Sequence, residues 1–244
     1  MKGLKALVVL FFLLSAVSAV HGEEKKENKR VSDQAELSFI DTSGNTEVTT
    51  FSLKNTLKYS YSNQTIGTWE LGALYGKSDG VKSAERYFTE FRLDHLYSER
   101  LYSYGNAGWL KDKFAGIDPR YYLGAGGGYK LLLGPTHFLL GEAGLTYTRE
   151  DYVDGTDRDY LGGRVFGLYE YVFNDKNKFF QSLEWLLDFD ETDNWLLNSE
   201  TGVISGLNGF LSLKASFVVQ YDNEPVMGLK HTDRTFGLTL VANY

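Results

Sequence analysis

Apolar and polar side chains alternate along most of the chain from Ala35 onward. In the segment 51–61 the odd positions are apolar or aromatic apart from Asn55, and the even positions are Ser, Thr or Lys. The segment 211–222 repeats this pattern, with Val218 as the exception on its polar face. Because successive side chains of a β-strand point to opposite faces, the alternation predicts strands with one apolar and one polar face.

Turn residues interrupt the alternation about every dozen positions, so the sequence divides into a series of predicted strands. The longer, charged connections, such as 150–159, follow odd-numbered strands, and shorter connections follow even-numbered ones. This alternation of loop length is typical of outer-membrane barrels, whose periplasmic turns are short. The pattern predicts an all-β fold, a transmembrane antiparallel up-and-down β-barrel of about 12 strands. The predicted strands are 35–41, 48–62, 66–77, 84–97, 101–111, 119–132, 137–149, 159–173, 178–188, 194–204, 210–222 and 233–244.

Aromatic residues make up 15% of the chain, yet its mean hydropathy is −0.29. A barrel explains this combination, because only one face of each strand meets lipid and aromatic girdles flank the apolar band. A soluble β-sandwich is the alternative, but it does not explain two aromatic bands. Aromatic residues near the short turns are Tyr59, Tyr61, Trp69, Tyr97, Tyr102 and Tyr129, and those near the long loops are Tyr75, Tyr87, Trp109, Tyr121, Tyr147, Trp185, Trp195 and Tyr221.

The N-terminal segment has the features of a secretory signal peptide. Two lysines precede a continuously apolar run over 6–14, which is too short to span a bilayer as a helix. We expect a signal peptide over 1–19, with cleavage after Ala19 or Gly22, and a periplasmic lead-in over 20–34. The barrel is then expected to occupy 35–244, and the protein to be exported to the cell outer membrane.

The last strand alternates up to a terminal aromatic residue, through Phe236, Leu238, Leu240, Ala242 and Tyr244. Chain ends of soluble domains usually fray, so an apolar strand that stops on its last residue is unusual there. The pattern resembles the signal that the barrel-assembly machinery reads, and it predicts that machinery as a partner.

Composition excludes several classes of function. The chain has no cysteine, so it forms no disulfide or thiolate metal site. Its formal charge is −7, and loss of the two leader lysines makes the mature chain −9. An acidic protein is a poor partner for nucleic acid, whose recognition depends on Lys and Arg. Outer-membrane lipid and lipopolysaccharide are the expected partners, no cofactor is expected, and the oligomeric state is left open.

Several segments resemble a known family as an ordered series. Together they are similar to the family of salt-induced outer-membrane proteins, a domain of unknown function. The resemblance covers nearly all of the mature chain and implies an outer-membrane barrel, but it supplies no catalytic or ligand-binding residue. The segments are TSGNT (42–46), AERY (84–87), LYSERLYSYG (96–105), KDKFAGIDPRYYLGAGGGY (111–129), SLKASFVVQYDNEPV (212–226) and KHTDRTFGLTLVANY (230–244).

No residue pattern indicates catalysis. Barrel phospholipases place a Ser two residues after their His, but two residues after His95 this chain has Tyr97. His137 lies at a turn after Thr136. The segments 188–190 (DFD) and 231–233 (HTD) superficially resemble the acid and histidine pairs of outer-membrane proteases, but the order of His and Asp is reversed. The acidic loops 151–159 and 188–193 lack an EF-hand spacing, so no metal site is predicted. The GAGGG segment over 124–128 is interpreted as a bend or a close-packing site in the barrel wall.

The polar faces of the predicted strands place charged side chains in the lumen. Buried charges must be paired or hydrated, so this lining indicates either an ion-paired, plug-like core or a narrow wet channel. Nine of these residues are acidic and six are basic, which predicts a weak preference for cations in any pore. The candidate lumen residues are Glu36, Lys54, Lys58, Glu70, Glu90, Arg92, Asp94, Lys130, Glu142, Arg164, Glu170, Glu184, Asp188, Glu200 and Lys214.

Three functions are compatible with these patterns. A structural or salt- and envelope-stress-related barrel with little conduction ranks first. A narrow, weakly cation-preferring porin-like channel for small solutes is the close alternative. A membrane-embedded enzyme acting on lipid or peptide ranks last, so the chain is not expected to be an enzyme.

Overall fold

The computed structural model describes residues 30–42, 48–225 and 231–244, so the predicted signal peptide lies outside the described residues. The described residues form twelve strands and one short 3-10 helix. The elements are β1 (Val31–Thr42), β2 (Val48–Ser60), β3 (Thr65–Ser78), β4 (Val81–Leu96), β5 (Leu101–Asp112), η1 (Lys113–Ala115), β6 (Ile117–Leu133), β7 (His137–Tyr152), β8 (Asp157–Asn174), β9 (Asn177–Asp188), β10 (Trp195–Gly206), β11 (Leu211–Asp222) and β12 (Thr232–Asn243). No helix among them is long and apolar enough to cross a membrane.

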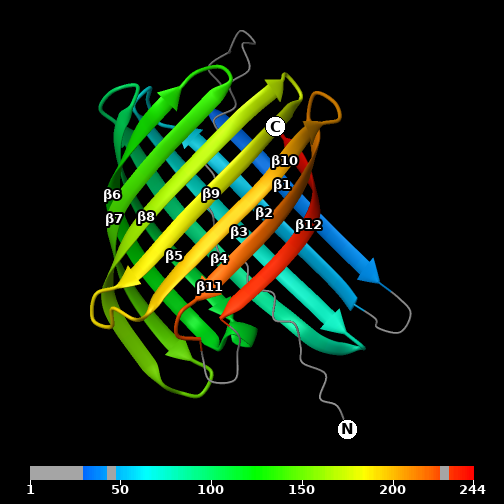
Figure 1. The fold of residues 1–244 in the computed structure, drawn as a ribbon, viewed down its shortest axis with the longest axis vertical. Helices are drawn as coiled ribbons and strands as arrows, with labels where there is room; N and C mark the ends of the chain where they lie inside the picture. The colour runs from blue at the N-terminus through cyan, green and yellow to red at the C-terminus, as the bar shows by residue number, and fades with distance from the viewer. Residues whose placement is uncertain (1–29, 43–47, 226–230) are drawn as a thin grey trace.

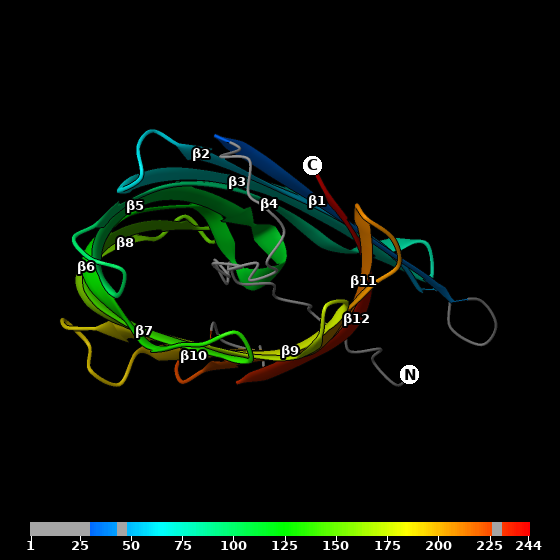
Figure 2. The ribbon, with the colours of Figure 1, turned by 90° about the horizontal axis from the view of Figure 1, so that it is seen from above.

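The twelve strands form one closed barrel (Figure 1). Each strand pairs antiparallel with its neighbours in sequence, and β1 pairs with β12 to close the ring. Seen from above, the ring is flattened into an oval (Figure 2). The predicted fold is therefore confirmed, including the number of strands.

The β3–β4, β5–β6 and β7–β8 connections are shorter than the sequence suggested, because these strands continue into segments predicted as loops. β3 and β4 are joined by Asp79 and Gly80 alone, which adopt φ angles of 50° and 75°. Positive φ at both central residues is typical of the two-residue turns that match strand twist. The end of the barrel that holds the β2–β3, β4–β5, β6–β7, β8–β9 and β10–β11 connections is called the short-turn end below, and the opposite end the long-loop end.

β1 begins earlier than expected. It starts at Val31, so the last four residues of the predicted lead-in 20–34 belong to the barrel. Asp33 exchanges two backbone hydrogen bonds with Tyr244, of 3.1 and 2.8 Å. These bonds tie the first strand to the terminal residue of the chain at the short-turn end.

Exposed apolar side chains cover the outer surface of the barrel, as an outward lipid-facing surface requires. One predicted girdle residue is misplaced: Tyr102 is 5% exposed and points into the lumen. On β5 the outward positions Ser103, Gly105 and Ala107 are small, and the inward positions include Tyr102 and Tyr104. The outward position that was predicted for Tyr102 from its aromatic character is therefore wrong.

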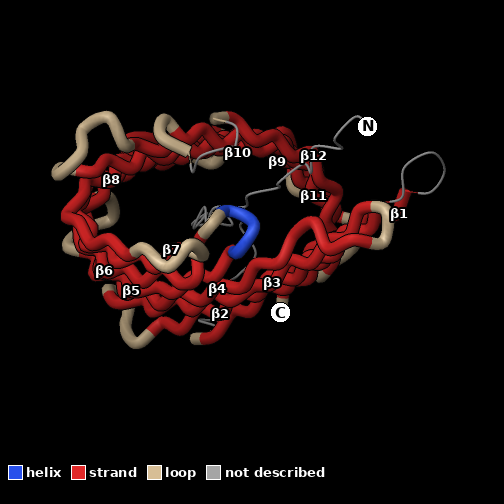
Figure 3. Tube along the Cα trace, turned by 90° about the horizontal axis from the view of Figure 1, so that it is seen from below, coloured by secondary structure: helices blue, strands red, loops and turns tan. Residues whose placement is uncertain are grey.

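The 3-10 helix η1 was not predicted. It follows β5, packs against β4, and lies inside the ring of strands (Figure 3). The Asp112 carboxylate caps it by accepting a hydrogen bond of 3.1 Å from the Ala115 backbone N–H. The connection between β5 and β6 therefore narrows the lumen at the long-loop end.

Candidate functional site

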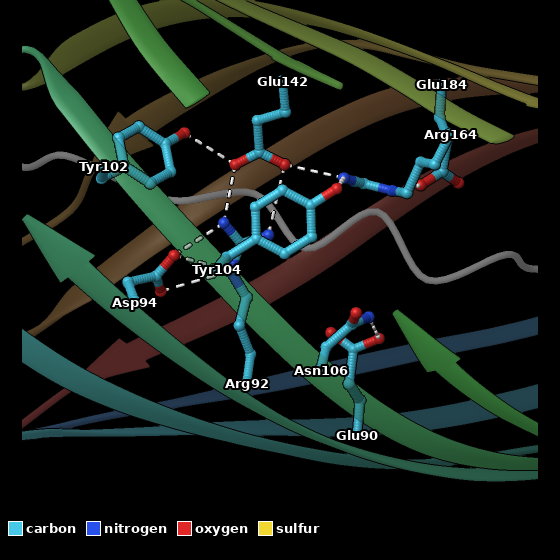
Figure 4. A network of polar contacts seen from close by, with 9 residues as sticks. All are labelled: Glu90, Arg92, Asp94, Tyr102, Tyr104, Asn106, Glu142, Arg164 and Glu184. Atoms are coloured by element: carbon cyan, nitrogen blue, oxygen red, sulfur yellow. Dashed lines mark hydrogen bonds and ion pairs between the residues drawn. The ribbon is translucent and has the colours of Figure 1, made fainter. Parts of the chain in front are cut away.

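The centre of the lumen holds a network of ion pairs (Figure 4). Arg92 on β4 donates to both carboxylate oxygens of Glu142 on β7, over 3.2 and 2.7 Å. Arg92 also binds Asp94, two positions along its own strand, at 2.7 Å. β5 and β6 separate β4 from β7 in the wall, so the Arg92–Glu142 pair crosses the interior.

Arg164 on β8 extends the network to a third region of the wall. Its Nη1 donates to Glu142 at 2.7 Å, and its Nε donates to Glu184 on β9 at 2.7 Å. Asn198 on β10 donates to the other oxygen of Glu184 at 3.2 Å. The Glu142 side chain has no exposed surface, and the Arg92 and Arg164 side chains are 4% and 7% exposed. These partners satisfy the charges that burial would otherwise make costly.

Tyrosines hold the network against the wall. The Tyr102 hydroxyl donates to Glu142 at 2.7 Å, and the Tyr122 hydroxyl donates to Glu90 at 2.5 Å. The Tyr104 ring lies under Arg92, with 4.3 Å between its centroid and the guanidinium carbon. Cation–π contact adds to the hydrogen bonds on Arg92.

Glycines in the neighbouring strands make room for these rings. A Cβ at Gly128 would lie 2.2 Å from Cζ of Tyr102, and a Cβ at Gly126 would lie 2.4 Å from the Ala143 carbonyl oxygen and 2.7 Å from the Tyr104 hydroxyl. Both glycines belong to the GAGGG segment, so this segment is a close-packing site in the wall. A Cβ at the outward-facing Gly127 would have its nearest neighbour at 3.7 Å, which is ordinary contact.

The short-turn side of the network is apolar. Phe138 and Leu140 on β7, Phe166 and Leu168 on β8, and Phe180 on β9 form a buried cluster inside the barrel. Along β7 the inward side chains therefore change from apolar to charged at Glu142. The cluster fills the lumen beside this part of the wall with side chains that bind no water.

The long-loop side of the network holds a cavity of about 190 Å³. Its floor includes Arg164 and Glu184, so it begins where the network ends. The candidate lumen residues did not include six charged residues that line it, namely Arg86, Arg120, Glu150, Arg158, Asp222 and Glu224. Arg120 pairs with Glu150, and Arg158 pairs with Asp188. Arg86 and Arg120 have the same parity as predicted inward residues of their strands, so this signal was present in the sequence.

A second group of ion pairs lines the wall near β1 and β2. Lys214 on β11 binds Glu36 on β1 at 2.5 Å and lies 3.8 Å from Glu200 on β10. Lys54 pairs with Glu70 at 3.1 Å. These contacts also join different strands across the inner surface.

All of the fifteen candidate lumen residues are buried or half-buried. Nine have less than a tenth of their surface exposed, namely Glu36, Glu70, Glu90, Arg92, Glu142, Arg164, Glu170, Glu184 and Asp188. Glu170 pairs with Lys178 at 2.8 Å. Lys58 and Lys130 form no ion pair with any residue that the structure describes.

The three histidines in the described part of the chain lie apart from one another at the barrel ends. His95 contacts Thr65 Oγ1 at 3.1 Å, His137 contacts the Tyr169 hydroxyl at 2.8 Å, and His231 contacts the Asp222 carbonyl at 2.8 Å. The structure holds Asp188 of the DFD segment in a buried pair with Arg158. The described part of the chain contains no cluster of three or more His, Cys, Asp or Glu able to hold a metal ion.

Solved structures with a similar fold include an autotransporter domain, an outer-membrane channel and a porin. The translocator domain of the autotransporter NalP from Neisseria meningitidis is 16% identical, with a TM-score of 0.53 over 88% of this chain and 87% of that one. An outer-membrane channel from Pseudomonas putida F1 is 11% identical, with a TM-score of 0.56 over 88% and 94%. The NanC porin is 7% identical, with a TM-score of 0.52 over 87% and 97%. These similarities concern the fold.

Sequence comparison gives the family. The uncharacterized protein YdiY of Escherichia coli strain K12 is 29% identical over 203 residues, which cover 83% of this chain and 79% of YdiY. Residues 35–244 match the family described as "Protein of unknown function, DUF481". That match spans every strand of the barrel except the first residues of β1. The chain is therefore a member of the DUF481 family of proteins of unknown function, with the fold of an outer-membrane β-barrel.

Proposed function

We propose that this protein spans the outer membrane and that its own side chains close its lumen, so that its role is structural rather than that of an open pore. One observation carries the proposal: Arg92, Glu142 and Arg164 join β4, β7 and β8 through buried ion pairs. Removing one partner of a buried pair costs about 3–5 kcal/mol. A solute that passed this level would have to separate such pairs or move around them.

The proposed role lies in the envelope. The resemblance to salt-induced outer-membrane proteins supports a function under salt or envelope stress. Export through the leader, insertion by the barrel-assembly machinery and contact with lipopolysaccharide belong to the same proposal. The outward apolar surface supports it, because such a surface is stable against lipid and costly against water.

A narrow channel for small solutes is the second candidate. The cavity of about 190 Å³ on the long-loop side favours it, because water can fill the lumen down to the ion-pair network. Two of the similar folds belong to a porin and to an outer-membrane channel. Conduction would then require a small displacement of the network.

Planar bilayer recording of the refolded full barrel tests the two candidates. We expect the unaltered protein to give no current steps, and Glu142→Gln to raise conductance because it removes the carboxylate shared by Arg92 and Arg164. Glu85→Gln is the matched control, since Glu85 pairs with Lys82, whose side chain is 43% exposed. Large, regular steps from the unaltered protein would contradict the closed lumen and support the channel.

A further inference from the structure

The seam between β1 and β12 is much shorter than any other in the barrel. Four positions pair, from Gln34 with Asn243 to Leu37 with Leu240, whereas β11 and β12 pair over eleven. The Asp33–Tyr244 backbone bonds extend this seam at the short-turn end. Leu37 is the last residue of β1 that pairs with β12. The two strands run apart toward the long-loop end (Figures 1 and 2).

The unpaired part of the seam lies in the apolar band of the outer surface. Phe39, Leu238 and Phe236 point outward and are 62%, 52% and 63% exposed. On the other edge of β12, which pairs with β11, Leu238 pairs with Ala215 and Phe236 pairs with Phe217. Phe217 is also outward and apolar. The seam therefore ends at the depth where the wall faces hydrocarbon.

Backbone groups at this depth need partners. Residues that exchange both backbone bonds alternate along an antiparallel ladder, and Asp33–Tyr244 is such a pair. Phe39 and Leu238 would form such a pair if the ladder continued, but the Ser38 hydroxyl instead donates to the Leu238 carbonyl at 3.0 Å. Irregular backbone is tolerated at membrane depth where it lines a water-filled cavity. Water from the lumen would reach the unpaired backbone groups of β1 and β12 through the gap between these strands.

The inner surface beside the gap is small and uncharged. Thr235, Gly237 and Thr239 on β12 face the lumen, because their outward neighbours alternate with them. The charged pair Lys214–Glu36 lies at the closed end of the seam, where Lys214 is level with Thr239 on the adjacent strand. A path from the membrane into the lumen thus passes apolar side chains, then hydroxyls, then an ion pair.

We propose that the gap between β1 and β12 is a lateral portal that admits the hydrocarbon chain of a membrane amphiphile into the lumen. The amphiphile keeps its polar group near Lys214 and Glu36 and its chain between the two strand edges. This proposal rests on the proposed outer-membrane location. Like strands of a second copy would not close the gap, because barrels in one orientation bring them together parallel, whereas every ladder here is antiparallel.

Photo-crosslinking in vesicles of dioleoylphosphatidylcholine tests the portal. p-Benzoylphenylalanine is placed at the position of Thr239 beside the gap, of Thr148 in the cavity wall on β7, or of Phe217 on the outer surface. We expect lipid adducts at Phe217 and Thr239 and none at Thr148. Absence of an adduct at Phe217 would overturn the membrane location itself. An adduct at Phe217 without one at Thr239 would overturn the portal alone, and so would a crosslink from Thr239 to a second protein chain.

A disulfide comparison tests the gap without relying on lipid capture. The chain has no cysteine, so each engineered pair is unambiguous. In the same vesicles, Leu37→Cys with Leu240→Cys should oxidise readily, because these positions are paired. Phe39→Cys with Leu238→Cys should oxidise far more slowly if the gap persists. Equal oxidation of both pairs would show a seam that closes in the bilayer, and would overturn the proposal.

Discussion

The Arg92 guanidinium on β4 makes a two-pronged contact with the Glu142 carboxylate on β7, across the width of two intervening strands. Planar bidentate contacts between arginine and a carboxylate are among the strongest charge-assisted hydrogen bonds. Glu142 also accepts from Arg164 and Tyr102. One carboxylate therefore joins three separate parts of the barrel wall.

Replacing this carboxylate by an amide should destabilise the barrel strongly. Glu142→Gln leaves Arg92 and Arg164 buried beside a neutral group, and we expect a loss of about 3–5 kcal/mol in the free energy of unfolding. Urea titration of the refolded protein in detergent micelles measures it. Glu85→Gln, at an exposed pair, should be nearly neutral, because solvent screens exposed ion pairs. Similar losses from both variants would mean that the network does not stabilise the barrel.

The glycines under the tyrosines offer a matched pair of substitutions. Gly128→Ala places a methyl group against the Tyr102 ring and should cost about 1–3 kcal/mol through overpacking. Gly127→Ala, one residue away on the outer face, should be nearly neutral. The same urea titration compares them, and Tyr102→Leu should rescue Gly128→Ala in part. If Gly127→Ala costs as much as Gly128→Ala, backbone freedom rather than ring packing explains the glycines.

The terminal aromatic residue should control assembly. Tyr244→Asp retains the backbone bonds to Asp33 but removes the ring, so we expect less folded protein in the outer membrane and more degradation in the periplasm. Quantitative blotting of membrane fractions measures this. Asn243→Asp adds the same charge one position earlier and should assemble better. Normal assembly of Tyr244→Asp would contradict the assembly signal.

Any residual current should prefer cations weakly, and the carboxylates responsible should lie at the cavity. Glu142 and Glu184 bind arginines, so they have little charge left to attract an ion. Asp222 and Glu224 line the long-loop side of the cavity instead. In Glu142→Gln barrels that conduct, Asp222→Asn should reduce the cation preference, as measured by the reversal potential in a salt gradient. Anion selectivity in the parent barrel would contradict this prediction.

The alternation of side chains predicted the strands well because a one-residue error in a half-buried strand would place a whole apolar face in the lumen. The same parity indicated which charges point inward. The prediction for Tyr102 was wrong, because it was based on aromatic character rather than on parity. Glycines on β6 provide the room that this ring needs inside the barrel. Those glycines and Tyr102 are more than twenty residues apart, and only the register of β5 and β6 brings them together.

The ion-pair partners of the lumen residues could not be predicted, because the ion pairs connect strands that are not neighbours. Parity places Arg92 and Glu142 inside, but their contact depends on the curvature of the ring and on strand tilt. The inward position of η1 and the short β1–β12 ladder also depend on the shape of the whole ring. The sequence pattern of a single strand predicts neither feature.

The short β1–β12 ladder has a consequence for the order of folding. Its partners are about two hundred residues apart in the chain, so forming it carries the largest loop-closure entropy of any pairing in the barrel. Neighbouring hairpins gain eleven or more paired positions after closing only a short turn. Ring closure should therefore follow the formation of the other ladders and be the first step to reverse. An open, curved sheet with intact hairpins is then the expected first product of unfolding.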